Sequence, residues 1–231
     1  MSVTMRRTIV VMAKAPIPGR VKTRLCPPLD LRTAARLHES FVLDALEKAA
    51  AIPDTELVIS YAPRGGLAYF RDAAPGARAY LLQEGRNLGE RMSRCFEALC
   101  EPGRAVALIG TDVPTLPARC LELAFDALAS SLVDVVFGPA SDGGYYSVAM
   151  TSVHPRLFKG ISWTTPEVLA QSIEKAAELD LGWYLLPEWY DVDRPADLAY
   201  LKSELLDHWA ARSSVRHTRD VLRSLVNAGM L

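Results

Sequence analysis

The sequence predicts an α/β fold with a doubly wound, mostly parallel sheet, and three observations lead to that prediction. The chain has 231 residues of which half are apolar, which fits one medium-sized domain better than two small ones. Short β-branched runs alternate with longer segments of helical periodicity. Strands that are separated by single helices pair in parallel through right-handed crossovers, so the alternation predicts helices on both faces of one sheet.

The first 139 residues supply most of this alternation. The first apolar run, "TIVVMA" at 8–13, is followed by a segment of helical period and then by the strand-like "ELVISYA" at 56–62. The pattern predicts strands at 8–13, 56–62, 79–83, 105–110 and 134–139, and helices at 31–50, 87–100 and 117–129.

After Pro139 the rhythm changes. The strand-like "GGYYSVAM" at 143–150 follows the previous strand after only a short glycine-containing turn, which favours an antiparallel or edge strand within the sheet. A helix from about Thr165 to Asp180, a strand near 182–187 and a helix from Pro195 complete the expected domain. The sheet is therefore expected to be Rossmann-like with one antiparallel strand.

The chain is expected to divide into a domain at 1–202 and a helical extension of the same domain at 203–231. Ser213 to Leu231 has an amphipathic pattern, with apolar Val215, Leu222, Leu225 and Val226 away from a basic face. That face consists of Arg212, Arg216, Arg219 and Arg223. Docking of the apolar side on the domain is favoured over docking of a partner protein.

Charge and composition exclude several classes of protein. The 26 Lys and Arg nearly balance the 27 Asp and Glu, so no global basic field for nucleic acid exists. The N-terminal apolar stretch is short and is interrupted by Lys14 and Pro16, so neither a signal peptide nor a membrane span is expected. The four cysteines form no CxxC pair, which is typical of reduced thiols. These features favour a cytoplasmic protein.

A local basic cluster follows the first predicted strand. Between Met12 and Leu29 the chain carries Lys14, Arg20, Lys22 and Arg24 with no acidic residue among them. Ligands of open α/β sheets lie at the carboxyl ends of strands, and such cations suit a di- or triphosphate. Neither a Walker A loop nor a GxGxxG motif is present. A solvated basic turn is the alternative, although uncompensated cations at short range repel one another.

Five sequence blocks in a fixed order resemble a known superfamily. They are "AKAPIPGRVKTRL", "GTDVPTL", "GPASDGGYYSV", "ISWTTPEVL" and "YDVDRPADL". Together they resemble the bacterial glycosyltransferase-A-like proteins called nucleotide-diphospho-sugar transferases, and more distantly the molybdenum-cofactor and phospholactate guanylyltransferases. The resemblance covers about Ile9 to Leu201. It implies a glycosyltransferase-A type of fold.

The resemblance also implies positions for a nucleotide and a divalent cation, Mg²⁺ or Mn²⁺. Asp112, at the end of a strand, is the implied metal ligand, and Asp193 is a second one. Either aspartate could instead cap a helix or form a turn. Arg194 replaces the small hydroxyl residue common in relatives. The implied contacts of the nucleotide in and before the first loop are Ala13, Lys14, Gly19, Arg20, Lys22 and Arg24.

Further candidates lie in three later segments. Gln83, Gly85 and Asn87 follow a strand and suit contacts to a base or ribose, while Asn87 with Glu90 also has the pattern of a capping box. Thr164 and Glu167 have the same capping pattern. The expected contacts to an acceptor are Asp142, Gly144, Tyr145 and Trp163, against the alternatives of a tight turn and ordinary core packing.

The function expected from these residues is metal-dependent transfer from a nucleotide donor to a small-molecule acceptor. Lys22, Arg20 and Asp112 are the expected catalytic residues, because phosphoryl-type chemistry needs mainly positioning and charge neutralisation. The donor is a nucleoside triphosphate, with pyrophosphate release, or a nucleotide sugar. A non-catalytic nucleotide sensor or scaffold is the alternative, and a homodimer is compatible with either.

Overall fold

A computed structural model describes residues 5–207 and 215–231. The strands are β1 (Arg6–Lys14), β2 (Thr55–Ala62), β3 (Ala79–Leu82), β4 (Arg104–Ile109), β5 (Val135–Pro139), β6 (Tyr145–Met150) and β7 (Trp183–Leu185). The helices are α1 (Leu31–Ala50), α2 (Leu67–Ala73), α3 (Leu88–Leu99), α4 (Ala118–Leu128), α5 (Val168–Glu178), α6 (Pro195–Lys202) and α7 (Arg216–Asn227).

The strands form one sheet in the order β3-β2-β1-β4-β6-β5-β7. β1 pairs in parallel with β2 and β4, and β5 pairs in parallel with β7. β6 is antiparallel to both β4 and β5, between which it is inserted. The predicted α/β class, the mostly parallel sheet and its antiparallel strand are therefore confirmed.

Helices cover both faces of the sheet. One core joins the sheet to α1, α2 and α4 through residues such as Val42, Phe70 and Phe125. The second core joins the opposite face to α3 and α5, through Phe96 and Ala176 among others. This arrangement is double winding, because the helices that connect the strands lie on both faces of the sheet.

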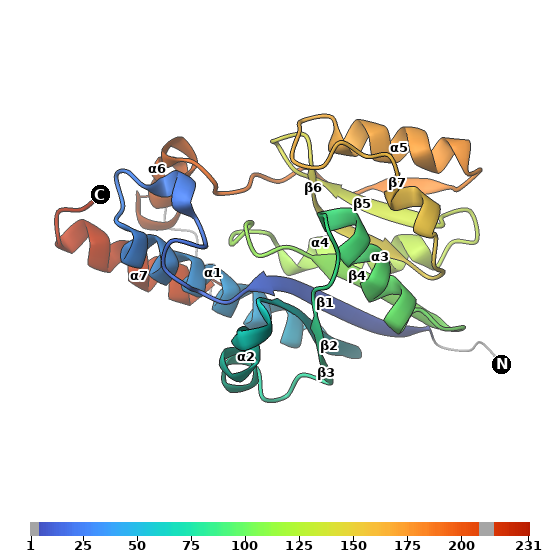
Figure 1. Cartoon of the computed structure of the whole chain (residues 1–231), viewed down its shortest axis with the longest axis horizontal. Coiled ribbons are helices and arrows are strands. Elements are labelled where there is room, and N and C mark those ends of the chain that lie inside the picture. The colour runs from blue at the N-terminus through green and yellow to red at the C-terminus, as the bar shows by residue number, and fades with distance from the viewer. Residues whose placement is uncertain (1–4, 208–214) are drawn as a thin grey trace.

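A third core lies beyond the end of β1, where Figure 1 shows α6, α7 and the C-terminus gathered at the side opposite to the N-terminus. It joins Leu25 of the basic loop and Phe41 of α1 to Val192 and to Leu222 and Leu225 of α7. The C-terminal helix thus docks through its apolar face, as predicted. Arg216 and Arg223 are exposed, whereas Arg212 and Ser213 lie outside the described residues.

Two predictions about helices need correction. α2 was not expected, yet its residues provide the crossover that parallel pairing of β2 with β3 requires. α5 begins at Val168 rather than near Thr165, with Glu167 as its N-cap residue. Thr164 has a φ of 76°, outside the extended region that N-cap residues adopt. The capping box predicted for Thr164 and Glu167 is therefore wrong.

Within the described ranges, every helix is too short or too polar to cross a bilayer. The cysteines of the chain are free thiols, with Cys95 and Cys120 buried and Cys26 and Cys100 partly buried.

Candidate functional site

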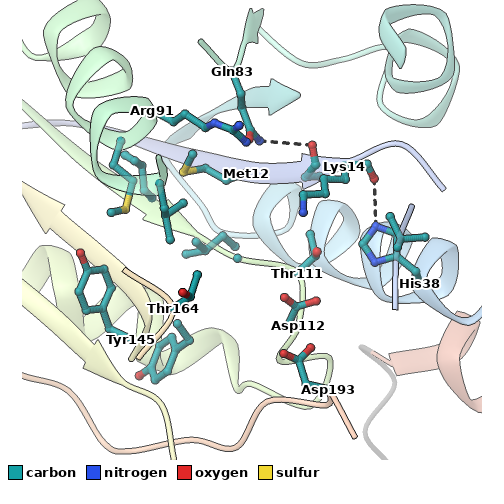
Figure 2. A pocket seen from close by; sticks show the side chains of 18 of the residues that line it. Met12, Lys14, His38, Gln83, Arg91, Thr111, Asp112, Tyr145, Thr164 and Asp193 are labelled. Carbon is teal, nitrogen blue, oxygen red and sulfur yellow. Dashed lines mark hydrogen bonds between the residues drawn. The ribbon is translucent and has the colours of Figure 1, made fainter. Parts of the chain in front are cut away.

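A cavity of about 580 Å³ lies at the edge of the sheet where β1 and β4 end. This is the edge at which doubly wound sheets bind ligands, and the volume falls within the usual range for small-molecule sites. Figure 2 shows Gln83 and Arg91 on one side and Asp112 and Asp193 on another, with Lys14 between them. The site therefore combines residues from distant parts of the sequence.

Ten of the predicted site residues line this cavity. They are Ala13, Lys14, Arg20, Lys22, Arg24, Gln83, Asn87, Asp112, Tyr145 and Asp193. Five others do not line it: Gly19, Gly85, Asp142, Gly144 and Trp163. The structure thus brings together the basic loop, the two candidate metal ligands and part of the segment after β3.

The two outlying glycines have roles in the backbone. Gly19 has a φ of 76° and Gly85 a φ of 144°, both in the region that glycine adopts at little cost. A Cβ on Gly85 would also lie 2.8 Å from Cβ of Glu90. The turns that they form explain both glycines, and a contact of either one with a nucleotide stays a prediction.

The predicted acceptor contacts Asp142, Gly144 and Trp163 are likewise explained by packing and turn geometry. The Asp142 carboxylate accepts a hydrogen bond from Gly144 N at 2.8 Å, within the turn between β5 and β6. Trp163 packs edge-on against Tyr145 and so close to Gly89 that a Cβ there would lie 2.3 Å from the indole. Of the four expected acceptor contacts, only Tyr145 lines the cavity.

The centre of the site is an ion-paired group that we call the cavity cluster: Lys22, Asp112 and Asp193. The Lys22 ammonium lies 2.5 Å from Oδ1 of Asp112 and 2.8 Å from Oδ1 of Asp193, and it donates to the carbonyl of Val192 at 2.8 Å. Only 4% of the Lys22 side chain is exposed. The ring of Phe41 lies 5.6 Å from the ammonium on another side. Lys22 is thus held by the carboxylates, and does not extend freely into the cavity.

A backbone hydrogen bond brings the two aspartates together. Val192 N donates to the carbonyl of Asp112 at 2.9 Å, which holds the segment before α6 against the end of β4. α6 is capped by Asp197, whose carboxylate accepts from the backbone N–H groups of Asp193 and Arg194 at 3.0 and 2.7 Å. Asp193 is therefore not a helix cap, and its side chain is available to Lys22.

The pKa values of the cavity cluster reflect the balance of burial and pairing. Burial opposes the charged form of Lys22, but Asp112 and Asp193 outweigh it and raise the lysine pKa. Burial would raise the pKa of Asp112, yet the Lys22 ammonium lowers it below its ordinary range. The exposed fraction of the Asp112 side chain is 49%, because the cavity beside it is open. Lys22 and Asp112 are therefore both charged at neutral pH.

Sequence reasoning missed two cavity residues of chemical interest. Arg91 follows Asn87 by one turn of α3 and donates from Nε to the carbonyl of Gly85 at 3.2 Å. Its position one turn after a predicted ligand could have identified it. His38 of α1 is 4% exposed, its Nε2 lies 2.9 Å from the carbonyl of Lys14, and burial lowers its pKa. No local pattern of the sequence marks His38.

The oxygen atoms of the cavity cluster suit a hard cation. Two carboxylates and the Val192 carbonyl converge on one ammonium group, and Mg²⁺ and Mn²⁺ prefer such oxygen ligands together with phosphate oxygens. The Lys22 ammonium thus marks a position that a cation can occupy.

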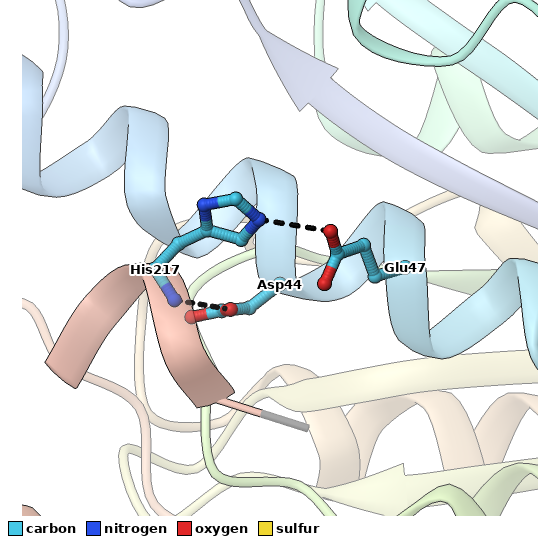
Figure 3. A group of neighbouring side chains, drawn as sticks. All are labelled: Asp44, Glu47 and His217. Carbon is cyan, nitrogen blue, oxygen red and sulfur yellow. Dashed lines mark hydrogen bonds and ion pairs between the residues drawn. The ribbon is translucent and has the colours of Figure 1, made fainter. Parts of the chain in front are cut away.

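A second group of charged residues, which we call the helix joint, lies between α1 and α7 (Figure 3). Asp44, Glu47 and His217 place ligand-type atoms within 4.8 Å of one another. The Asp44 oxygens accept from the backbone N–H groups of His217 and Thr218 at 3.0 and 2.9 Å. Glu47 pairs with the guanidinium of Arg216 and with His217 Nε2. The joint therefore fastens the first turn of α7 to α1.

Comparison with known proteins yields a family and several structural neighbours. The model of a family described as "uncharacterized protein conserved in bacteria (DUF2064)" matches residues 45–165. A crystal structure from Desulfovibrio desulfuricans G20, described as a "putative nucleotide-diphospho-sugar transferase", is 32% identical with a TM-score of 0.86. The match covers 98% of this chain and 97% of that one. No curated protein matches the chain.

More distant neighbours share the fold alone. A CMP:2-keto-3-deoxy-manno-octonic acid synthetase complexed with CTP is 12% identical, with a TM-score of 0.56 over 88% of this chain and 100% of that one. Rv0371C of Mycobacterium tuberculosis, in complex with manganese, is 15% identical, with a TM-score of 0.51 over 86% and 98% of the two chains. These similarities agree with the superfamily resemblance of the five sequence blocks.

Proposed function

This chain belongs to the DUF2064 family, and we propose that it is a divalent-cation-dependent transferase that uses a nucleotide as donor. The preferred reaction is nucleotidylyl transfer from a nucleoside triphosphate, with release of pyrophosphate. The acceptor is a small molecule with a nucleophilic oxygen.

The balance of charge in the cavity carries this proposal. Five basic side chains line the cavity, against the two carboxylates of Asp112 and Asp193. The basic residues are Lys14, Arg20, Lys22, Arg24 and Arg91. A polyphosphate with a divalent cation complements such a set, because the carboxylates bind the cation and the basic groups neutralise the phosphate oxygens. A neutral substrate would leave most of these cations uncompensated.

The segment after β3 is suited to a nucleobase. Both contacts from Nε2 of Gln83 go to backbone carbonyls, of Ser60 at 2.8 Å and of Ala13 at 3.4 Å. Its Oε1 therefore remains as an acceptor for an amino or imino group of a base. Met12 and Leu88 line the same cavity and offer apolar surface.

Transfer at this site needs positioning and electrostatic stabilisation. The acceptor oxygen forms a bond to the α-phosphorus while the bond from that phosphorus to the leaving pyrophosphate breaks. Lys14, Arg20 and Arg24 would stabilise the charge that collects on the departing phosphates. A cation held by Asp112 and Asp193 would polarise the phosphate oxygens when bound.

A thermal-shift panel of nucleoside triphosphates and nucleotide sugars, each with and without Mg²⁺ or Mn²⁺, tests the proposal. The cognate nucleotide should raise the melting temperature only with the cation, by a stabilisation of about 2.7 kcal/mol at a hundred times its dissociation constant. If no nucleotide shifts the transition, the proposal is wrong. Stabilisation by a nucleotide sugar alone favours glycosyl transfer, which the description of the Desulfovibrio neighbour supports.

Turnover separates an enzyme from a nucleotide sensor. Pyrophosphate release from the bound triphosphate, measured across a set of phosphorylated and hydroxylated acceptors, supports nucleotidylyl transfer. Release of a nucleoside diphosphate from a nucleotide sugar supports glycosyl transfer. Tight binding without either product supports the sensor.

A further inference from the structure

Each N–H donor of the Lys22 ammonium has an oxygen acceptor nearby. Its three N–H donors face three oxygen acceptors, from Asp112, Asp193 and the Val192 carbonyl, at 2.5 to 2.8 Å. The neighbouring Arg24 behaves differently: it is 67% exposed and its guanidinium lies 3.7 Å from Asp193. Of these two basic residues, Lys22 is the one that replaces solvent at the carboxylates.

A divalent cation and this ammonium compete for the same oxygens. Mg²⁺ binds oxygen ligands at about 2.0–2.1 Å, so small rotations of the two carboxylates would close the present arrangement around a metal ion. The ammonium cannot remain at the centre of those oxygens, since two cations at that separation repel strongly in a partly buried site. Binding of the metal to both aspartates thus requires Lys22 to leave.

We propose that Lys22 competes with the divalent cation for Asp112 and Asp193. The phosphates of the donor would draw the Lys22 ammonium away from these carboxylates and so allow the cation to bind them. The long side chain can swing from the carboxylates toward phosphate oxygens in the adjoining cavity, where Lys14 and Arg20 also lie. Metal and polyphosphate then bind cooperatively, and each raises the affinity of the site for the other by the same factor. The phosphate half of this inference rests on the proposed function, whereas the competition does not.

Binding of Mn²⁺ alone, followed by the electron paramagnetic resonance signal of the free ion, tests the competition without nucleotide or turnover. Lys22→Met should bind Mn²⁺ at least about tenfold more tightly than the unaltered protein, in the usual range of coupling between sites. Lys22→Gln should show the same gain while keeping amide donors to the carboxylates. Arg71→Met, which removes a cation at an exposed position of α2, is the control and should bind Mn²⁺ as the unaltered protein does.

Two further measurements test whether the gain in Mn²⁺ affinity arises at the cavity cluster and in folded protein. Adding Asp193→Asn to Lys22→Met should abolish the gain, which assigns the bound ion to the cavity cluster. Mn²⁺ should also raise the melting temperature of Lys22→Met and Lys22→Gln more than that of the unaltered protein, which shows that the variants are folded. Folded Lys22 variants that bind Mn²⁺ no more tightly than the unaltered protein overturn the proposal.

The outcomes for the two proposals are separable. A gain in Mn²⁺ affinity without any nucleotide binding retains the competition and rejects the transferase. Cation-dependent nucleotide binding without that gain retains the transferase and rejects Lys22 as competitor.

Discussion

The cavity cluster and the helix joint contain the same kinds of side chain but differ in what satisfies their carboxylates. In the helix joint, the Asp44 oxygens accept from two backbone N–H groups, and Glu47 is held by Arg216 and His217. In the cavity cluster, Asp112 and Asp193 are paired with the ammonium of a flexible side chain.

Backbone donors cannot be exchanged for a ligand without unfolding the helix that carries them, whereas an ammonium group can move. A metal ion in the helix joint would also meet the guanidinium of Arg216 beside Glu47. Proximity of ligand-type atoms is therefore weaker evidence of a site than the nature of their present partners. We therefore propose ligand binding for the cavity cluster and a stabilising role for the helix joint.

The largest expected effect is on turnover, from Asp112→Asn. The change keeps the shape of the side chain but removes a charged cation ligand, so kcat should fall by about a hundredfold or more. The melting temperature should stay within a few degrees, because half of the Asp112 side chain is exposed to the cavity. Steady-state kinetics and thermal melts provide the measurements.

Asp72→Asn, at an exposed position of α2, is the control and should leave both quantities unchanged. Equal activity of Asp112→Asn and Asp72→Asn would remove the distinction between the two clusters.

The next effect concerns stability, from Asp44→Ala in the helix joint. Two backbone N–H groups at the start of α7 lose their acceptors, and one of them is buried, so the free energy of unfolding should fall by about 2 kcal/mol. Urea denaturation measures the loss, and hydrogen exchange should locate it in α7. Activity per folded molecule should change little, in contrast with Asp112→Asn. A loss of activity without a loss of stability would contradict the structural role of the joint.

Much of the fold was predictable because local signals agree with tertiary packing. α1 spans the predicted 31–50, and Asp30 caps it by accepting from the N–H groups of Arg32 and Thr33. The Asn87 cap of α3 was also predicted correctly, although Glu90 accepts from Arg86 N rather than closing the box. α2 was missed because Gly and Pro residues surround it and weaken any helical pattern.

The site was predictable at strand ends and less so elsewhere. Position after an apolar strand predicted that Asp112 and the basic loop share one edge of the sheet. The meeting of Lys22 with both aspartates depends on the hydrogen bond between Val192 N and the Asp112 carbonyl, which no local pattern encodes. Trp163 is not among the residues that line the cavity and packs against Gly89, a contact that no local pattern of the sequence predicts.

A smaller effect is expected at Asp191, near the cavity cluster. Burial and the nearby Asp142 carboxylate raise its pKa to about 6, above the unfolded value of about 3.9. The folded protein therefore binds more protons between these values, and stability falls as the pH rises from about 4 to 6. Asp191→Asn should remove this cost and stabilise the protein at pH 7 by about 1 kcal/mol, after allowance for partial exposure.

Thermal melts across pH 3 to 7 check this prediction. The gain from Asp191→Asn should shrink as the pH falls from 6 to 4 and should vanish below about pH 4, where the native side chain becomes protonated in both states. A gain of equal size at all pH values would show that ionisation is not its cause.

The smallest effect is expected from Glu47→Gln in the helix joint. The loss of stability in this variant should depend on salt and on pH. Pairing with Arg216 lowers the pKa of Glu47, so its contribution is present above the ordinary pKa of glutamate and is lost as the pH falls through the folded value. Because Glu47 is 42% exposed, the variant should lose only about 0.5 kcal/mol at pH 7.

Urea denaturation at low and high salt measures this loss, which should shrink in 1 M NaCl. The loss should also decline as the pH falls below the ordinary glutamate pKa and vanish below the lowered folded value. Ion pairing of the enclosed Lys22 ammonium is screened less, so the Mn²⁺ gain of Lys22→Met should persist when potassium chloride is raised. A loss at Glu47 that is insensitive to salt would mean that it acts through buried hydrogen bonds as Asp44 does. The helix joint would then be a single buried cap rather than a cap with an exposed ion pair beside it.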